Sequence, residues 1–108
     1  MRRCDAEAES ELRVAIHLRS DLPLFHCALG RQLEKQGRYD EAESAYKTAL
    51  TLNVSDYLAN LRYGEFLHYR GFPQRAMQYA RRALAAAPDD RRIHELIQSL
   101  EKDVDPGE

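Results

Sequence analysis

Residues 23–56 read PLFHCALGRQLEKQGRYDEAESAYKTALTLNVSD, and residues 57–90 read YLANLRYGEFLHYRGFPQRAMQYARRALAAAPDD. When the second stretch is aligned with the first at an offset of 34 positions, small residues align with small residues and apolar residues with apolar residues. The matching pairs are Leu24 and Leu58, Gly30 and Gly64, Leu33 and Leu67, Gly37 and Gly71, Ala42 and Ala76, Ala49 and Ala83, and Leu50 and Leu84. Most charged positions differ between the two stretches, so the shared pattern is structural and the chain contains an internal repeat.

Each repeat has the pattern of two amphipathic helices. In the first repeat, apolar residues recur at helical spacing from Leu24 to Leu33. Gly37 then supplies a residue that can adopt the left-handed conformation and end this helix. Asp40 stands where its side chain can cap the second helix, whose apolar face continues to Leu52.

The second repeat predicts the same two helices, over 57–70 and 74–86, with a turn between them. Pro73 stands at a helix start, where its missing N–H group costs no hydrogen bond. Pro88 is expected to end the second of these helices because proline cannot continue the hydrogen-bond ladder.

Gly30 and Gly64 fall in the middle of expected helices. A glycine there costs about 1 kcal/mol relative to alanine, so it needs a packing reason. The reason available is a close approach of the paired helix, at Ala42 in the first repeat and at Ala76 in the second. We therefore expect each helix pair to cross tightly at its glycine.

These residues resemble the tetratricopeptide-repeat family, whose pattern combines small residues at the helix crossing with a glycine at the turn. The matching residues are Leu29, Gly30, Leu33, Gly37, Tyr39, Ala42, Tyr46, Ala49 and Leu50 in the first repeat, and Gly64, Leu67, Gly71, Ala76, Ala83, Leu84 and Pro88 in the second. The departures from the pattern are His26, Val54, Asn60, Tyr63 and Ala80. The resemblance implies an all-α fold, a right-handed superhelical stack of antiparallel helix pairs.

Half a repeat is expected on each side of the two full repeats. Residues 5–18 align with the second helix of a repeat, and residues 91–102 align with a first helix. The outer face of 91–102 is polar, as a capping helix requires. We therefore expect about six helices in a single domain, 1–108, which ends in an acidic tail over 103–108.

The composition and the first residues bear on location. The longest apolar stretch is too short to cross a bilayer, so no transmembrane helix is predicted. Acidic side chains recur over 5–11, where a signal peptide would need an apolar run, and a cytoplasmic location is expected. Cys4 and Cys27 are the only cysteines, and two thiols without a disulfide framework fit a reduced compartment.

No motif predicts an enzyme, a metal site or a cofactor. The four histidines fall in four different expected helices, without the spacing of metal ligands. The glycines belong to the repeat rather than to a phosphate-binding loop, and no serine has the flanking glycines of a nucleophile elbow. Arginines gather between residues 57 and 92, but the net charge of −2 and the lack of a known motif favour no nucleic acid partner.

The resemblance also implies a binding surface, because in this family the first helices of successive repeats line a concave groove that receives a peptide or helix. Carried over by position, the groove residues are Leu24, Cys27, Arg31, Leu58, Leu61, Arg62, Glu65, His68, Tyr69 and Arg92. An apolar strip flanked by arginines indicates a ligand with apolar anchors and acidic neighbours. Some members bind the C-terminal carboxylate of heat-shock chaperones through a set of basic and amide side chains. At the matching positions of this sequence, only Arg92 has the required charge.

The expected function is that of a protein–protein interaction module, such as an adaptor, an assembly factor or a small chaperone. The alternative is a regulatory or structural segment of a larger enzyme or secretion-machine protein. A homodimer is a further expectation, formed through the half-repeat helix 5–18. Without a partner helix, this segment would expose apolar surface at Leu12, Ile16 and Leu18.

Overall fold

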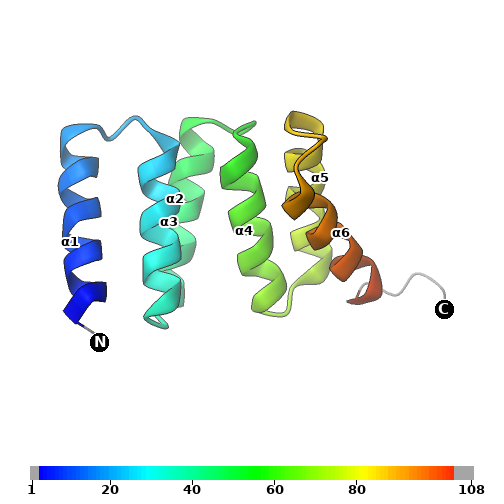
Figure 1. Ribbon diagram of the computed structural model, residues 1–108, viewed down its shortest axis with the longest axis horizontal. Coiled ribbons are helices and arrows are strands. Elements are labelled where there is room, and N and C mark those ends of the chain that lie inside the picture. The colour runs from blue at the N-terminus through cyan, green and yellow to red at the C-terminus, as the bar shows by residue number, and fades with distance from the viewer. Residues whose placement is uncertain (1–2, 104–108) are drawn as a thin grey trace. The chain divides into compact units, whose positions relative to one another are not determined.

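The computed structural model describes residues 3–103, and over this range it contains six α-helices and no β-strand (Figure 1). The helices are α1 (Arg3–Leu18), α2 (Pro23–Lys35), α3 (Tyr39–Leu52), α4 (Tyr57–Tyr69), α5 (Pro73–Ala86) and α6 (Arg91–Asp103). The all-α fold expected from the repeat is confirmed.

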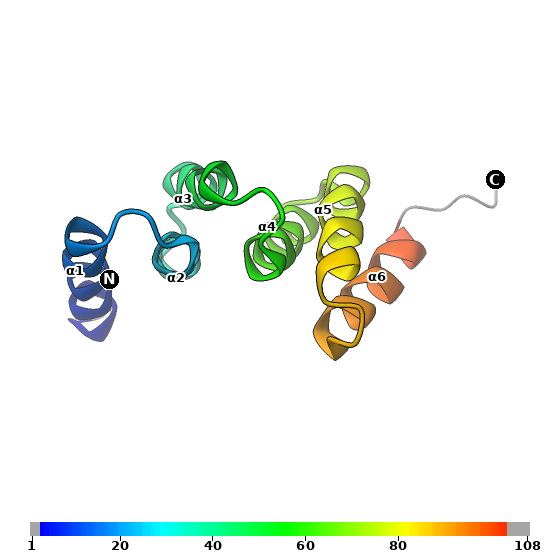
Figure 2. The same cartoon turned by 90° about the horizontal axis from the view of Figure 1, so that it is seen from above.

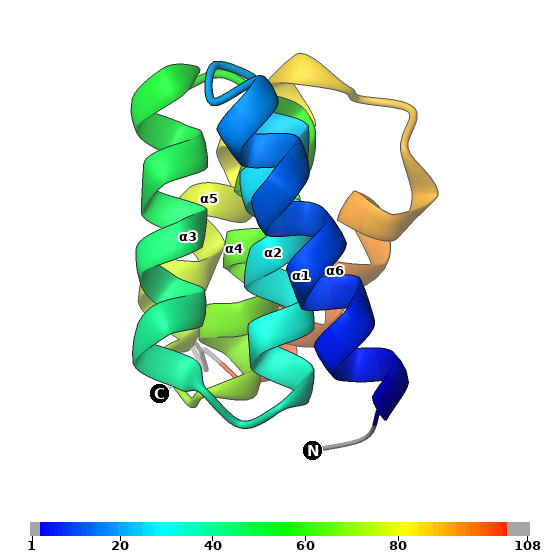
Figure 3. The ribbon, with the colours of Figure 1, turned by 90° about the vertical axis from the view of Figure 1, so that its left-hand side faces the viewer.

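Two compact units make up the chain, the first ending at Val54 and the second beginning at Ser55. In the first unit α2 packs against both α1 and α3, and Figures 2 and 3 show α2 beside each of them. In the second unit α5 packs against α4 and α6, and α4 also contacts α6. The pairs α2–α3 and α4–α5 are the antiparallel helix pairs of the two repeats.

Two glycines with left-handed backbone end the first helix of each repeat. The φ angle is 75° at Gly37 and 91° at Gly71. At the first turn the amide of Arg38 donates to the carbonyl of Leu33 at 3.0 Å, and the same carbonyl accepts from the amide of Gln36 at 3.1 Å, so the helix end is closed by hydrogen bonds. The amide of Phe72 makes the equivalent bond at the second turn. The turn role predicted for Gly37 is confirmed.

The helix starts are less regular than the turns. Asp56 caps α4, because its carboxylate accepts a hydrogen bond from the amide of Ala59 at 2.9 Å. The cap prediction for Asp40 is wrong. The turn is so short that α3 already begins at Tyr39, with Arg38 as the cap residue and no side-chain cap bond. Asp40 lies in the first turn instead, where its charge favours the positive end of the helix dipole.

Two histidines at equivalent repeat positions each form a hydrogen bond to the loop that precedes their helix. The Nε2 group of His26 hydrogen-bonds the carbonyl of Ser20 at 3.0 Å, and that of His94 hydrogen-bonds the carbonyl of Pro88 at 2.6 Å. A carbonyl only accepts, so each Nε2 carries the proton. His26 is half-buried and fills the position where the family pattern has a bulky residue. Its ring nitrogen also holds the preceding loop through the hydrogen bond to Ser20.

The crossing of α2 and α3 depends on an aromatic ring. A Cβ atom on Gly30 would lie 2.9 Å from Cε1 of Tyr46, closer than real Cβ atoms come. Ala42 is buried as predicted, but the atoms nearest to such a Cβ belong to the Tyr46 ring, which the prediction did not include. The Tyr46 hydroxyl donates to Glu34 at 2.9 Å. Burial, together with the nearby Glu34 carboxylate, raises the pKa of Tyr46 well above its ordinary value.

The crossing of α4 and α5 brings backbone against backbone. A Cβ atom on Gly64 would lie 3.4 Å from the carbonyl oxygen of Ala76 and 3.6 Å from the amide nitrogen of Ala80. Ala80 stands at the repeat position where the first repeat has Tyr46, so no ring separates the two helices. The predicted approach of Ala76 to Gly64 is confirmed.

A larger side chain at the second crossing should therefore destabilise the protein. Ala76→Leu is expected to lower the free energy of unfolding by about 1–3 kcal/mol, because Ala76 is buried and the α4 backbone cannot retreat without losing contacts. Ala86→Leu on the exposed face of the same helix is the control and should change it by less than about 0.5 kcal/mol. Urea titration of both variants measures the difference, and equal stabilities would contradict the packing.

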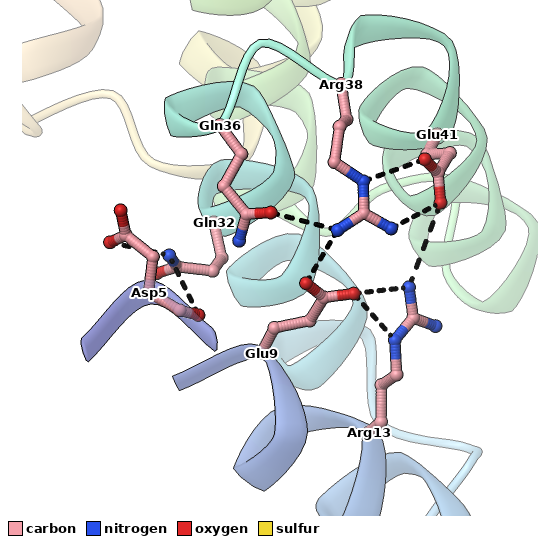
Figure 4. Close-up of polar contacts among 7 residues, drawn as sticks. All are labelled: Asp5, Glu9, Arg13, Gln32, Gln36, Arg38 and Glu41. Carbon is pink, nitrogen blue, oxygen red and sulfur yellow. Dashed lines mark hydrogen bonds and ion pairs between the residues drawn. The ribbon is translucent and has the colours of Figure 1, made fainter. Parts of the chain in front are cut away.

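Charged side chains join α1 to the α2–α3 turn and to α3 (Figure 4). The Glu9 carboxylate of α1 accepts hydrogen bonds from Arg13 at 3.0 Å and from Arg38 at 2.7 Å. Arg38 in turn donates twice to Glu41, each time at 2.8 Å. Every α1 residue whose burial is described is half-buried or exposed, so α1 adds no fully buried side chain to the core, and this network joins it to the α2–α3 pair.

The network makes the attachment of α1 sensitive to acid. Partial burial by itself raises the pKa of Glu9, but the hydrogen bonds from Arg13 and Arg38 outweigh it, and the net pKa lies below the ordinary value. A carboxyl whose pKa is lowered by folding stabilises the folded state above its unfolded-state pKa, about 4.3 for glutamate. That stabilisation is lost as the pH falls through the lower folded-state pKa.

Replacing Glu9 should remove part of this pH dependence. In Glu9→Gln the free energy of unfolding should fall at pH 7, and its difference from the wild type should be smaller at pH 3, where the carboxyl is largely protonated in the unfolded state and its pKa in the folded state is lowered. Glu11→Gln is the matched control, because Glu11 is an exposed α1 residue outside the network. Chemical unfolding at both pH values measures the effect. A Glu9 variant with the full wild-type pH dependence would show that the ion pairs contribute nothing.

Candidate functional site

A groove lies between α4 and α6 in the second unit. Its volume is about 460 Å³. The residues that line it are Glu65, His68, Tyr69, Arg92, Glu95, Leu96 and Ser99. The lining residues of α4 are 65, 68 and 69, and those of α6 are 92, 95, 96 and 99. Residues three or four positions apart lie on the same side of a helix, so each helix presents one face to the groove.

The apolar part of the groove consists of one buried and one exposed residue. Leu96 is buried and reaches towards Gly64, where a Cβ atom would lie 3.2 Å from its Cδ2 atom. Glycine at position 64 therefore leaves the space that Leu96 occupies. Tyr69 is 69% exposed, and an aromatic ring so open to solvent is available for contact with a partner.

Arg92 is held at the groove by Asp90. Its guanidinium donates to the two Asp90 oxygens at 3.1 and 2.7 Å, and the Arg92 amide donates to the same carboxylate at 2.9 Å. These hydrogen bonds lower the pKa of Asp90 and raise that of Arg92. The bidentate pair fixes the orientation of the guanidinium and leaves part of it exposed.

The other charged groups of the groove are also paired. Glu65 accepts a hydrogen bond from Arg62 on the same helix at 2.9 Å. His68 contacts the Asp103 carboxylate at 2.5 Å and so links the last turns of α4 and α6. Glu95 pairs with Arg91 at 3.1 Å. The groove therefore offers an apolar floor with charged groups of both signs, each paired with a neighbour, at its edges.

Comparison with known proteins gives the family of the chain. The family model described as tetratricopeptide repeat matches residues 27–91, more than half of the chain. The chain belongs to the tetratricopeptide-repeat family. A solved structure described as the Arabidopsis OM64 TPR domain is similar over 94% of this chain and 84% of that one, with a TM-score of 0.85 and 19% sequence identity. That likeness shows the fold. No curated protein matches the sequence.

The family assignment gives a general function and no more. Tetratricopeptide-repeat domains are protein–protein interaction modules. Within residues 3–103 no group of three or more His, Cys, Asp or Glu side chains is placed to hold a metal ion. No helix in the same range is long and apolar enough to cross a membrane.

Four of the ten residues carried over from the family line the second-unit groove. They are Glu65, His68, Tyr69 and Arg92. Leu58 and Arg62 are half-buried and lie outside the lining, although Arg62 holds Glu65. Leu24 and Arg31 are exposed residues of the first unit.

Two of the carried-over residues are buried and offer no surface to a ligand. Cys27 and Leu61 occupy the same repeat position, and both belong to the core. The repeat position shows on which side of the helix a residue lies, but not whether neighbouring side chains cover it. Small or apolar residues at this position are covered, which removes them from the candidate site.

Sequence reasoning missed Glu95, Leu96 and Ser99 as groove residues. They lie one repeat beyond Leu61, Arg62 and Glu65 respectively. Extending the groove positions along α6 would have found all three, whereas only Arg92 was carried over. Glu95 adds an acidic group to a wall that was expected to be basic.

The first unit holds a separate cleft between its three helices. Its volume is about 500 Å³. Ile16 from α1, Leu29 and Leu33 from α2, and Ala45 from α3 form its apolar lining. None of the residues carried over from the family lines this cleft. It is lined partly by α1 and α3, which correspond to second helices, whereas the resemblance implies a groove lined by first helices.

Proposed function

We propose that this tetratricopeptide-repeat protein binds a peptide or helix of a partner protein in the groove between α4 and α6. The observation that supports this most is Tyr69, a largely exposed aromatic side chain beside the buried Leu96. Exposed aromatic groups next to an apolar floor are typical of interaction surfaces. The role is that of an adaptor, an assembly factor or a small chaperone, without catalysis.

The groove chemistry suggests the character of the ligand. An apolar side chain of the partner would rest on Leu96 and against the Tyr69 ring. An acidic residue next to that anchor would face Arg92, whose side chain stays 44% exposed beside its pair with Asp90. Glu65 and Glu95 would accept hydrogen bonds from backbone amides or from a basic residue of the same ligand.

A second candidate is self-association through α1. The structure places Leu12 and Ile16 half-buried, so they do not expose the apolar surface expected of them. Leu18 is 72% exposed as expected, and Val14 is 57% exposed in addition. Two large apolar side chains on one helix face are a surface that a second copy would cover.

The setting that we propose is the cytoplasm. Cys4 is exposed and Cys27 is buried, and they do not form a disulfide. An exposed thiol of this kind fits a reduced compartment. The chain would act there as a module by itself or as a regulatory or structural segment of a larger enzyme or secretion-machine protein.

The groove proposal predicts which substitutions abolish partner capture. The experiment compares three immobilised proteins: the wild type, Tyr69→Ala and Arg92→Glu. Each is incubated with the same cell lysate, and quantitative mass spectrometry measures the proteins that each one captures. Partners of the groove should bind the wild type and be lost about tenfold or more from both variants, since each removes or reverses a central contact.

Lys47→Glu is the control, because Lys47 is exposed on α3 in the other unit. It changes the charge by as much as Arg92→Glu without touching the groove. For an identified partner, Arg92→Glu should weaken binding more than Arg92→Ala. Capture that survives both groove substitutions but is lost from the Lys47 variant would place the binding surface on the first unit.

A further inference from the structure

The cleft of the first unit is bridged at one end by an ion pair. Arg13 of α1 and Glu41 of α3 both line the cleft, and their Nη2 and Oε1 atoms lie 4.0 Å apart across it. The other end lies beside the loop between α1 and α2, where His26 hydrogen-bonds the carbonyl of Ser20. The cleft volume of about 500 Å³ is within the range of binding sites for small groups, about 300–1,000 Å³.

The floor between these two ends is apolar and reaches the surface only in part. Leu33 is buried, whereas Leu29 of α2 is 7% exposed and Ala45 of α3 is 8% exposed. Ile16 of α1 is half-buried and completes the floor. Leu29 and Ala45 come from the paired helices of the first repeat, so the second repeat has a counterpart for each of them.

The second repeat has aromatic rings at both of these positions. Tyr63 lies one repeat beyond Leu29, and Tyr79 lies one repeat beyond Ala45. The two rings meet edge to face with their centroids 4.7 Å apart, a favourable arrangement for aromatic pairs. Where the second repeat places two rings, the first repeat has a leucine and an alanine, and both of these line the cleft. The chain itself therefore shows an aromatic ring packing at the position where Ala45 leaves space.

The charged end of the cleft also differs between the repeats. In the second repeat the guanidinium of Arg75 donates to the hydroxyl of Tyr63 at 3.2 Å, and the counterpart of Arg75 is Glu41. Arg38 donates to both oxygens of Glu41, and these hydrogen bonds lower the pKa of Glu41. The carboxylate is therefore ionised at neutral pH and only accepts hydrogen bonds. Because it offers about four lone-pair sites, it can accept from a further O–H or N–H donor.

We propose that the cleft of the first unit binds a tyrosine side chain of a partner protein. The ring packs on Leu29 and Ala45, as the Tyr79 ring packs on Tyr63 in the second repeat. The hydroxyl of the partner's tyrosine donates to Glu41. This site lies in the other unit from the groove between α4 and α6, so it is a second binding site and does not depend on the function proposed for that groove.

Charge at the same end of the cleft selects the neighbours of the tyrosine. Asp40 and Glu41 are both exposed in the first turn of α3. Arg13 is engaged by Glu9, whose carboxylate accepts from it at 3.0 Å. Basic residues beside the tyrosine are therefore attracted to α3, whereas a carboxylate or a phosphate is repelled. The partner segment combines a tyrosine with lysine or arginine neighbours, unlike the ligand with acidic neighbours proposed for the groove at Arg92.

Titration of the wild type with p-cresol, which is the tyrosine side chain without its backbone, tests the site directly. The methyl NMR signals of Ile16, Leu29 and Leu33 should shift, while that of the buried Leu67 in the second unit should not. p-Cresol should bind about fivefold more tightly than toluene, which lacks the hydroxyl, because one hydrogen bond is lost. Glu41→Met keeps the length of the side chain but removes the acceptor, so this preference should disappear.

A second test fills the cleft from within. Ala45→Tyr places a ring where the second repeat has Tyr79, and it should abolish the shifts caused by p-cresol. Lys47→Tyr is the control, because Lys47 is exposed on α3 outside the cleft lining, and this variant should bind p-cresol like the wild type. Circular dichroism shows whether each variant is folded. The titration of the wild type decides the question by itself if Ala45→Tyr does not fold.

Two short peptides distinguish a protein ligand from a free phenol. A tyrosine flanked by two lysines, with blocked termini, should bind more tightly than p-cresol, and a tyrosine flanked by two glutamates should bind more weakly. If p-cresol binds as tightly as the lysine peptide, the ligand is a small phenol and the proposed partner is wrong.

Two further outcomes overturn the proposal. If millimolar p-cresol shifts none of the methyl signals of Ile16, Leu29 and Leu33, the cleft is not a site for a tyrosine ring, and the groove between α4 and α6 is unaffected by that result. If the same signals shift when the protein concentration alone is raised, a second copy of the chain occupies the cleft in place of a partner protein.

Discussion

The close crossing of paired helices at a glycine is the constraint on which the rest of each unit depends. At Gly30 the missing side chain makes room for the Tyr46 ring, and at Gly64 it makes room for the backbone of α5. A mid-helix glycine weakens its own helix by about 1 kcal/mol, so the pair must recover that cost through packing. The two repeats meet the same constraint differently, because Ala80 replaces the aromatic residue of the first repeat.

The same glycine also shapes the candidate binding site. Leu96 fills the space beside Gly64 and forms the floor of the groove, so a residue in the middle of α4 determines how deeply α6 packs. The edges of the groove are fixed by separate means, through the Asp90–Arg92 pair and the His68–Asp103 contact. Apolar packing thus sets the depth of the groove, and local ion pairs set the position of its charged groups.

The sequence was sufficient for features that depend on local periodicity. The six helices follow from the 34-residue repeat, and the turns follow from Gly37 and Gly71, since few other residues tolerate their backbone conformation. Features that depend on how far a neighbour reaches were not predictable in this way. Cys27 and Leu61 lie at a groove position of the repeat but are covered, and the Tyr46 ring, which the prediction did not include, provides the atoms nearest to Gly30.

The weak burial of α1 has a consequence for the order in which the helices open. Whereas α2 to α6 each contribute buried residues, every α1 residue whose burial is described retains some exposure, and an ion pair joins Glu9 of α1 to Arg38. Backbone amides in such a helix exchange with solvent through local opening, at a free energy well below that of global unfolding. Opening should begin at α1 while the α2–α3 pair stays closed, and it should become easier as salt screens the Glu9–Arg38 contact. Any molecule that covers the outer face of α1 would slow this exchange without altering the core.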